Sequence, residues 1–152
     1  MGARFHLPAV FVGISVLVLS VCALAQEACS LTVRNKSGST IGRIDGNGKI
    51  RNASGTTIGR FDEGAVRNAS GATIGRVDGD GKIRNSSGST IGRIDQNGRL
   101  RNANGSVIGR IDTNGTIRNK NGSTRGRFDG YVPACRHVSA AYLFFFEPLH
   151  KQ

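Results

Sequence analysis

The sequence predicts an all-β protein built from tandem β-hairpin repeats of about 17 residues, arranged as a closed ring or a propeller-like array. One pattern recurs six times, Arg-Asn-x-x-Gly-x-x-Ile-Gly-Arg-h-Asp-x-x-Gly-x-h, in which h is apolar. The copies follow one another at 17 residues, once at 16, which suits two short strands and is too short for two helices. With 22 glycines and no tryptophan, the chain cannot fill a thick core. The copies start at Val33, Ile50, Val66, Ile83, Leu100 and Ile117.

Residues 1–25 are predicted to be a cleaved signal peptide. Arg4 supplies a positive charge, residues 9–21 are mostly apolar, and residues 23–25 form a small-x-small cleavage pattern. The mature chain would then begin at Gln26. We therefore expect an exported protein of the periplasm, the cell surface or the extracellular space, without intracellular nucleic acid as a partner.

Two alternatives to a cleaved signal stay open. The first is a transmembrane anchor, although the apolar run is shorter than the ~20 residues that span a bilayer. The second is a lipoprotein modified at Cys22, although Val21 stands where a smaller residue is usual. In the favoured interpretation, no transmembrane anchor remains after cleavage.

Residues 26–32 form a short lead, and residues 33–131 hold the six hairpin repeats. A glycine follows each Arg-Asn step at a fixed distance, as Gly88 follows Arg84 and Asn85. A second glycine follows most of the aspartates, as in Gln96-Asn97-Gly98. Asn-Gly, Ser-Gly and Asp-Gly steps supply the positive φ angles of hairpin turns, so a meander of short antiparallel strands is expected.

In the first five repeats the isoleucine before Gly-Arg and the apolar residue after it are three residues apart, as Ile91 and Ile94 are. In a regular strand they would point to opposite faces. A β-bulge at Gly92 could return both to the core. Alternatively, Gly92 lets neighbouring backbones approach closely near an axis.

The closing segment, residues 132–152, departs from the repeat. Within it, residues 138–146 form an apolar run that ends in three phenylalanines and is too short to span a membrane. We expect it to add an aromatic closing strand to the core; a sticky end that faces a membrane or a partner is the alternative. In the sixth copy, Arg125 stands where the pattern has isoleucine.

Two cysteines remain after signal cleavage, Cys29 before the first repeat and Cys135 after the last. Export to an oxidising compartment permits a disulfide. If the repeats close into a ring, the two cysteines become neighbours and can form one. An open array would leave two unpaired thiols.

The tandem repeats behind a signal-like segment, ended by the aromatic run at residues 140–146, resemble the bacterial 5-fold β-flower proteins. The resemblance covers residues 33–146. It implies a flower-like ring of hairpin petals in an exported bacterial protein, and it implies no known activity and no functional residues. Because there are six copies, one could lie outside the ring, or residues 125–128 could lead into the tail.

The arginines of the repeats are the main candidates for binding, and the formal net charge of +11 allows an anionic partner. Alternatively, the charge simply follows from two arginines and one aspartate per copy. The arginines of the Gly-Arg-h-Asp segment are expected to pair with its aspartate. The Arg-Asn step has no matching acid nearby in sequence, so its arginines are candidate anion-binding residues. They are Arg34, Arg51, Arg67, Arg84, Arg101 and Arg118.

The sequence predicts no catalytic residues, no metal site and no cofactor. The Asp-x-Asn-Gly turns lack the late glutamate of a calcium loop. His137 lies near Cys135 in sequence, but no third group is placed to orient the pair. We therefore expect a non-enzymatic structural or protein-interaction module of the bacterial cell envelope. The alternative is a polyanion-binding module for lipopolysaccharide phosphates or acidic glycans, and the actual partner, whether an envelope protein or an anionic glycan, is unknown.

Overall fold

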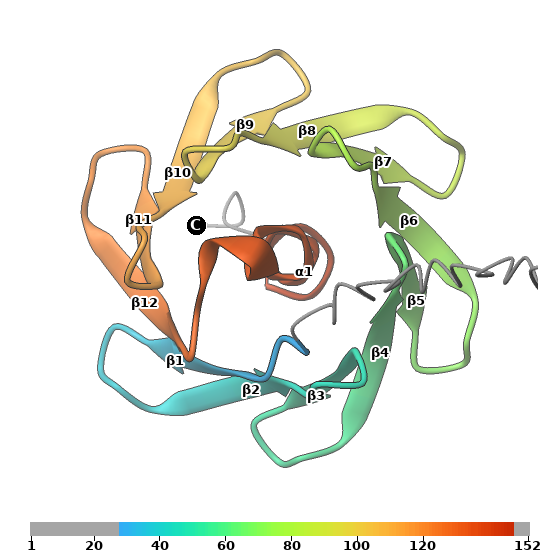
Figure 1. The fold of residues 1–152 in the computed structure, drawn as a ribbon, viewed down its shortest axis with the longest axis horizontal. Coiled ribbons are helices and arrows are strands. Elements are labelled where there is room, and N and C mark those ends of the chain that lie inside the picture. The colour runs from blue at the N-terminus through green and yellow to red at the C-terminus, as the bar shows by residue number, and fades with distance from the viewer. Residues whose placement is uncertain (1–27, 148–152) are drawn as a thin grey trace, which may run out of the picture.

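The computed structural model describes residues 28–147, which form a closed barrel of twelve antiparallel strands around a central helical segment (Figure 1). Every strand pairs with its neighbours in the chain, and β1 pairs with β12 to close the ring. The strands are β1 Leu31–Asn35, β2 Thr40–Ile44, β3 Lys49–Asn52, β4 Thr57–Asp62, β5 Ala65–Asn68, β6 Thr73–Val77, β7 Lys82–Asn85, β8 Thr90–Ile94, β9 Arg99–Asn102, β10 Val107–Ile111, β11 Thr116–Asn119 and β12 Thr124–Asp129. The predicted all-β ring of short hairpins is confirmed.

Each petal ends in a turn that its own asparagine organises. In the hairpin of β7 and β8, the Asn85 side-chain oxygen accepts hydrogen bonds from the backbone N–H groups of Ser87 and Ser89. Gly88 has a φ of +84° with open space around it, so the turn needs its conformational freedom. The six petals spread around the ring in Figure 1.

All six copies belong to the ring, so neither suggested exception for a sixth copy is correct. The sixth copy supplies β12, which pairs with β11 on one side and with β1 on the other. Val33 lies opposite Phe128, and both side chains are buried. The residues 125–128 are therefore part of the sheet and do not lead out of it.

The hairpin between β4 and β5 is the irregular one, because its repeat is a residue short. Asp62 lies opposite Ala65, so only Glu63 and Gly64 form the turn. Their φ angles are +46° and +88°, as a two-residue type I′ turn demands. Glu63 is the only non-glycine residue with positive φ in the described chain.

A β-bulge brings both apolar residues of the repeat to the inner side, as the hairpin of β7 and β8 shows. Between β7 and β8 the register passes from Ile83–Gly92 to Arg84–Thr90, so Ile91 is the extra residue. Ile94 is buried and Ile91 packs partly buried against the same core. A Cβ on Gly92 would lie 2.3 Å from Phe144. Both expected features therefore occur: a bulge, which lies at Ile91 and not at Gly92, and a close approach of other atoms to Gly92.

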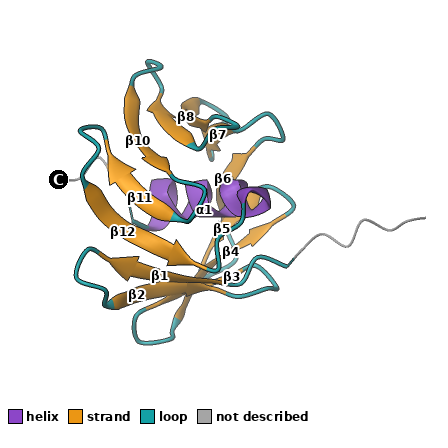
Figure 2. Ribbon diagram, turned by 60° about the vertical axis from the view of Figure 1, so that its left-hand side comes forward, coloured by secondary structure: helices purple, strands orange, loops and turns teal. Residues whose placement is uncertain are grey.

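The closing segment is helical, so the predicted aromatic C-terminal strand is wrong. It consists of η1 Pro133–Cys135, α1 Arg136–Ala141 and η2 Tyr142–Phe146, which lie inside the ring (Figures 1 and 2). All strand edges are already paired, so a further strand would find no partner, whereas a helix satisfies its own backbone hydrogen bonds. A twelve-stranded ring is too wide for strand side chains alone to fill.

Small residues let this helix fit in the barrel. Ser139, Ala140 and Ala141 are fully buried, and Tyr142 and Leu143 are nearly so.

No helix in residues 28–147 is long and apolar enough to cross a membrane. The predicted signal segment, residues 1–25, lies outside the described residues.

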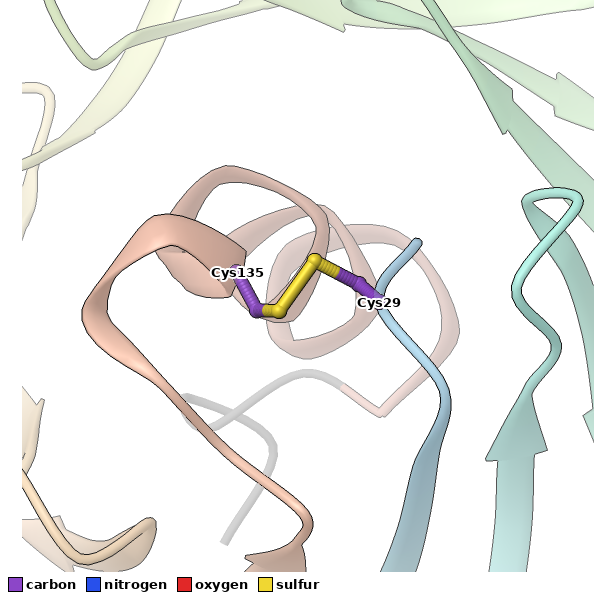
Figure 3. Close-up of a disulfide and its surroundings, with 2 residues drawn as sticks. All are labelled: Cys29 and Cys135. Carbon is purple, nitrogen blue, oxygen red and sulfur yellow. A yellow bond between two sulfur atoms is a disulfide. The ribbon is translucent and has the colours of Figure 1, made fainter. Parts of the chain in front are cut away.

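A disulfide joins Cys29 to Cys135, as ring closure predicted (Figure 3). It ties the segment before β1 to the start of the central helix, across a separation of 106 residues. Cys135 is buried. The two ends of the repeat array are thus held together twice, by the β1–β12 pairing and by a covalent bond.

Candidate functional site: an arginine belt on the outer surface

The repeat arginines form six pairs, each with one arginine directly opposite the other on neighbouring strands. Each pair combines an arginine of a Gly-Arg step with one of an Arg-Asn step. We call these twelve residues the arginine belt. The pairs are Arg43–Arg51, Arg60–Arg67, Arg76–Arg84, Arg93–Arg101, Arg110–Arg118 and Arg127–Arg34. Like charges directly opposite one another destabilise a sheet, so such pairs need a counter-charge.

In four pairs, one aspartate supplies that counter-charge to both arginines. Asp78 forms an ion pair with Arg76 Nε at 2.8 Å through one carboxylate oxygen and accepts a hydrogen bond from Arg84 Nε at 2.7 Å on the other. Asp95, Asp112 and Asp129 bridge their pairs in the same way. The expectation that the Arg-Asn step lacks a matching acid is therefore wrong: the aspartate approaches it across the hairpin.

The Arg-Asn arginines also stabilise the petal turns. Arg84 donates from Nη1 to the carbonyl oxygen of Gly88, 3.1 Å away. Arg34, Arg51, Arg67, Arg101 and Arg118 make the equivalent bond. The predicted anion-binding residues therefore already have structural partners, and the sequence reveals this only if strand pairing is known.

The Gly-Arg arginines are more available to a partner. Side-chain exposure is 62% for Arg76 against 32% for Arg84 of the same pair. The hydrogen bond from Arg84 is the main reason that the pKa of Asp78 lies below its ordinary value. Asp78 thus stays ionised at neutral pH, and the Arg76–Asp78–Arg84 group keeps one excess positive charge.

The Arg60–Arg67 pair lacks such a bridge. Among the described residues, neither of these arginines forms an ion pair, nor does Asp62, the aspartate of this repeat. Arg67 bonds instead to the Gly71 carbonyl and the Thr73 hydroxyl. The Arg60–Arg67 pair lies in the repeat that is one residue short, and this shorter spacing is the feature of the sequence that could have indicated a missing bridge here. At the neighbouring pair, Asp45 binds Arg51 alone.

The structure gives Cys135 and His137 no catalytic arrangement. Cys135 is in the disulfide and has no thiol to react. Burial, and then the charge of Arg136, lowers the pKa of His137, so its imidazole is neutral at pH 7. His137 lies at a cavity of about 760 Å³ beside the disulfide, with Asp62 and Glu63 also in its wall. No group of three metal-ligating side chains occurs in the described part of the chain.

Comparison with curated proteins and with solved structures gives no match. A family model described as 5-fold beta-flower protein matches residues 30–146, from the start of β1 to the end of the central helix. The match therefore spans both the petals and the segment that fills their ring. The barrel has six petals, one more than that description states. The family is not a known enzyme family. The chain belongs to the 5-fold beta-flower proteins.

Proposed function

We propose that this chain is an exported, non-enzymatic interaction module of the bacterial cell envelope. The observation that carries the proposal is the near-uniform repetition of the outer surface, in which the same arginine pair recurs six times around a closed ring. A catalytic site is a singular place, whereas a repeated surface suits a partner that is extended or itself repetitive. The disulfide favours an oxidising compartment.

Expression of the whole 152-residue chain in a Gram-negative host tests the export part of this proposal. We expect the product in the periplasmic or outer fraction, starting at Gln26 and lighter by two hydrogens before reduction than after. An uncleaved product in the cytoplasm with three free thiols, those of Cys22, Cys29 and Cys135, would contradict it. Chemical cross-linking in intact cells should then join the protein to envelope components rather than to cytoplasmic ones.

A second candidate, binding of a polyanion such as an acidic glycan or lipopolysaccharide phosphates, is favoured by the Arg60–Arg67 pair. Two opposed guanidinium groups without a counter-ion fit a phosphate, sulfate or carboxylate in the place that aspartate takes in the other pairs. The exposed Gly-Arg arginines on either side would extend such a contact along the belt.

Elution from a heparin column with increasing salt tests this second candidate. Arg60→Gln with Arg67→Gln removes the open pair, and Arg93→Gln with Arg101→Gln removes equal charge from a bridged pair. We expect the first double variant to elute at clearly lower salt than the second. Equal elution would mean that net charge alone causes retention, and the candidate would fail.

A further inference from the structure

The bulge residue that follows the petal turn points to the inner side in every repeat, and its chemistry changes only in the last. In the first five repeats it is an isoleucine packed against the core: Ile41, Ile58, Ile74, Ile91 and Ile108. In β12 the register shift between Ile117 and Arg118 makes Arg125 the extra residue. A half-buried guanidinium thus occupies a position that is otherwise apolar.

The central helix leaves a gap at the same repeat. Its aromatic rings cover the inward-facing glycines of four other petals: Tyr142 lies over Gly42, Phe146 over Gly59, Phe145 over Gly75 and Phe144 over Gly92. A Cβ on Gly126 would instead meet backbone atoms of Arg34 and Asn35, and no ring is among its nearest neighbours. The aromatic cover found at these four petals is therefore missing at the sixth.

A cavity of about 190 Å³ lies at this gap, between β12, β1 and the end of the central helix. Its apolar wall consists of Val33, Ile41, Ile117 and Leu143. Three cations, Arg34, Lys36 and Arg125, also line it, against one acid, Glu147. An apolar cavity of about 150 Å³ is enough to hold benzene, so this one can hold a small organic molecule.

Arg125 has no counter-charge in the described part of the chain. It makes no ion pair or side-chain hydrogen bond there, and Glu147 lies beyond ion-pair distance. By contrast, Arg34 in the same wall is held by Asp129 and by the Gly38 carbonyl. Partial burial of an unpaired charge is unfavourable, and isoleucine would fit the position without that cost. An anionic ligand would supply what Arg125 lacks.

We propose that this cavity binds a small amphipathic carboxylate, with the carboxylate on Arg125 and an acyl chain or ring against the apolar wall. This site lies inside the barrel rim and shares Arg34 with the arginine belt. Its proposed charge contact is Arg125, which is not a belt residue, so the site does not depend on the belt's proposed partner. The two can therefore fail separately: a glycan-binding defect at Arg60 and Arg67 would leave it intact.

Titration of the purified protein with octanoate, followed by amide chemical shifts in NMR and by calorimetry, tests the site. Acetate matches the head group alone, and octan-1-ol matches the chain alone. We expect octanoate to bind more tightly than either, with shifts at Val33, Gly126 and Leu143, and more weakly in high salt. Octanol or acetate binding as tightly as octanoate would overturn the proposal, as would no binding at all.

Arg125→Ile is the decisive variant, because isoleucine occupies this position in the other five repeats and should preserve the fold. Its affinity for octanoate should fall about tenfold or more, the loss expected for a charge-assisted hydrogen bond. Arg125→Gln, which keeps a polar side chain without the charge, should lose affinity similarly if Arg125→Ile fails to fold. The control Arg99→Gln removes one exposed charge elsewhere and should bind normally. Unchanged affinity in folded Arg125→Ile would refute the assignment.

Discussion

Asp78 shows how a single side chain makes the basic surface compatible with a sheet. Arg76 and Arg84 stand directly opposite each other, and the carboxylate between them accepts a hydrogen bond from Arg84 Nε on one oxygen and forms an ion pair with Arg76 Nε through the other. The contact with Arg84 is a charge-assisted hydrogen bond, which is stronger than an isolated surface ion pair. Three further aspartates do the same, so the repeat carries its own counter-ions.

Asp78→Asn should lower the free energy of unfolding by about 1 kcal/mol, because it leaves two opposed arginines without a shared anion. Asp62→Asn is the matched control: this aspartate makes no ion pair in the described chain, so the change should stay within about 0.5 kcal/mol. Urea unfolding followed by circular dichroism measures both. Equal losses of unfolding free energy in the two variants would show that the contacts of Asp78 with Arg76 and Arg84 add nothing to stability.

The contacts between these aspartates and arginines also predict how stability depends on pH. The pKa of Asp78 and that of Asp129 are lowered, first by the hydrogen bonds from Arg84 and Arg34 respectively. The folded protein then binds protons less readily than the unfolded chain, whose aspartates titrate near ~3.9. The lowered pKa of His137 predicts a first decline as the pH falls through about 6.5, because the unfolded chain binds this proton more readily than the folded protein does. The contribution of the aspartates should be constant from neutral pH to about pH 5 and should fall progressively as the pH drops below about 4. Asp78→Asn should show a shallower fall over that range; a slope equal to that of the unaltered protein would contradict the assignment.

At the scale of the element, the glycine of each Ile-Gly-Arg step matters because it faces the central helix. A Cβ on Gly75 would lie 2.3 Å from Phe145 and 2.4 Å from the Arg84 carbonyl oxygen. Strand and helix therefore fit only where glycine removes the side chain. This explains how the strands and a central helix of small and aromatic residues pack in direct contact.

Gly75→Ala should destabilise the protein by about 1–3 kcal/mol through overpacking against Phe145 and the backbone. Gly79→Ala, at a turn glycine with open space around it, should be nearly neutral. In a double-mutant cycle, Phe145→Leu should recover part of the Gly75→Ala loss, with a coupling of roughly 0.5 kcal/mol or more. Strictly additive losses of unfolding free energy for Gly75→Ala and Phe145→Leu would mean that residue 75 does not contact the Phe145 ring.

The elements differ in how well the sequence predicts them. The petal turns and strands follow from local chemistry, since the Asn85 side chain and Gly88 define their turn without help from the rest of the chain. The closing segment does not: its apolar composition suits strand or helix, and the choice depends on whether any sheet edge is left unpaired. The partners of the Arg-Asn arginines cannot be found from the repeat either, because the aspartate that binds them comes from across the hairpin.

At the scale of the whole molecule, the six copies form a closed ring, and this closure has consequences that no single repeat predicts. It brings Cys29 to Cys135, encloses the helix, and sets the sixth repeat beside the first, where Arg125 and Arg34 share a cavity. The copy number can be counted in the sequence. Whether six such hairpins meet depends on strand tilt and twist, which no single repeat reveals.

Replacing both cysteines by serine should lower the free energy of unfolding by about 4–5 kcal/mol if chain entropy dominates, since the bond closes a long loop. The single variant Cys29→Ser should cost nearly as much, because it also removes the bond. Guanidinium unfolding with and without reductant measures the effect. A loss below about 1 kcal/mol would show that strand pairing alone determines ring stability.

Closure is tested most directly by NMR contacts and hydrogen exchange at the junction of β1 and β12. We expect cross-strand contacts between Val33 and Phe128 and between Arg34 and Arg127, with amides that exchange as slowly as those of the interior pair β7 and β8. Absence of these contacts, together with rapid exchange along β1 and β12, would mean that both strands are free edges and that the ring is open.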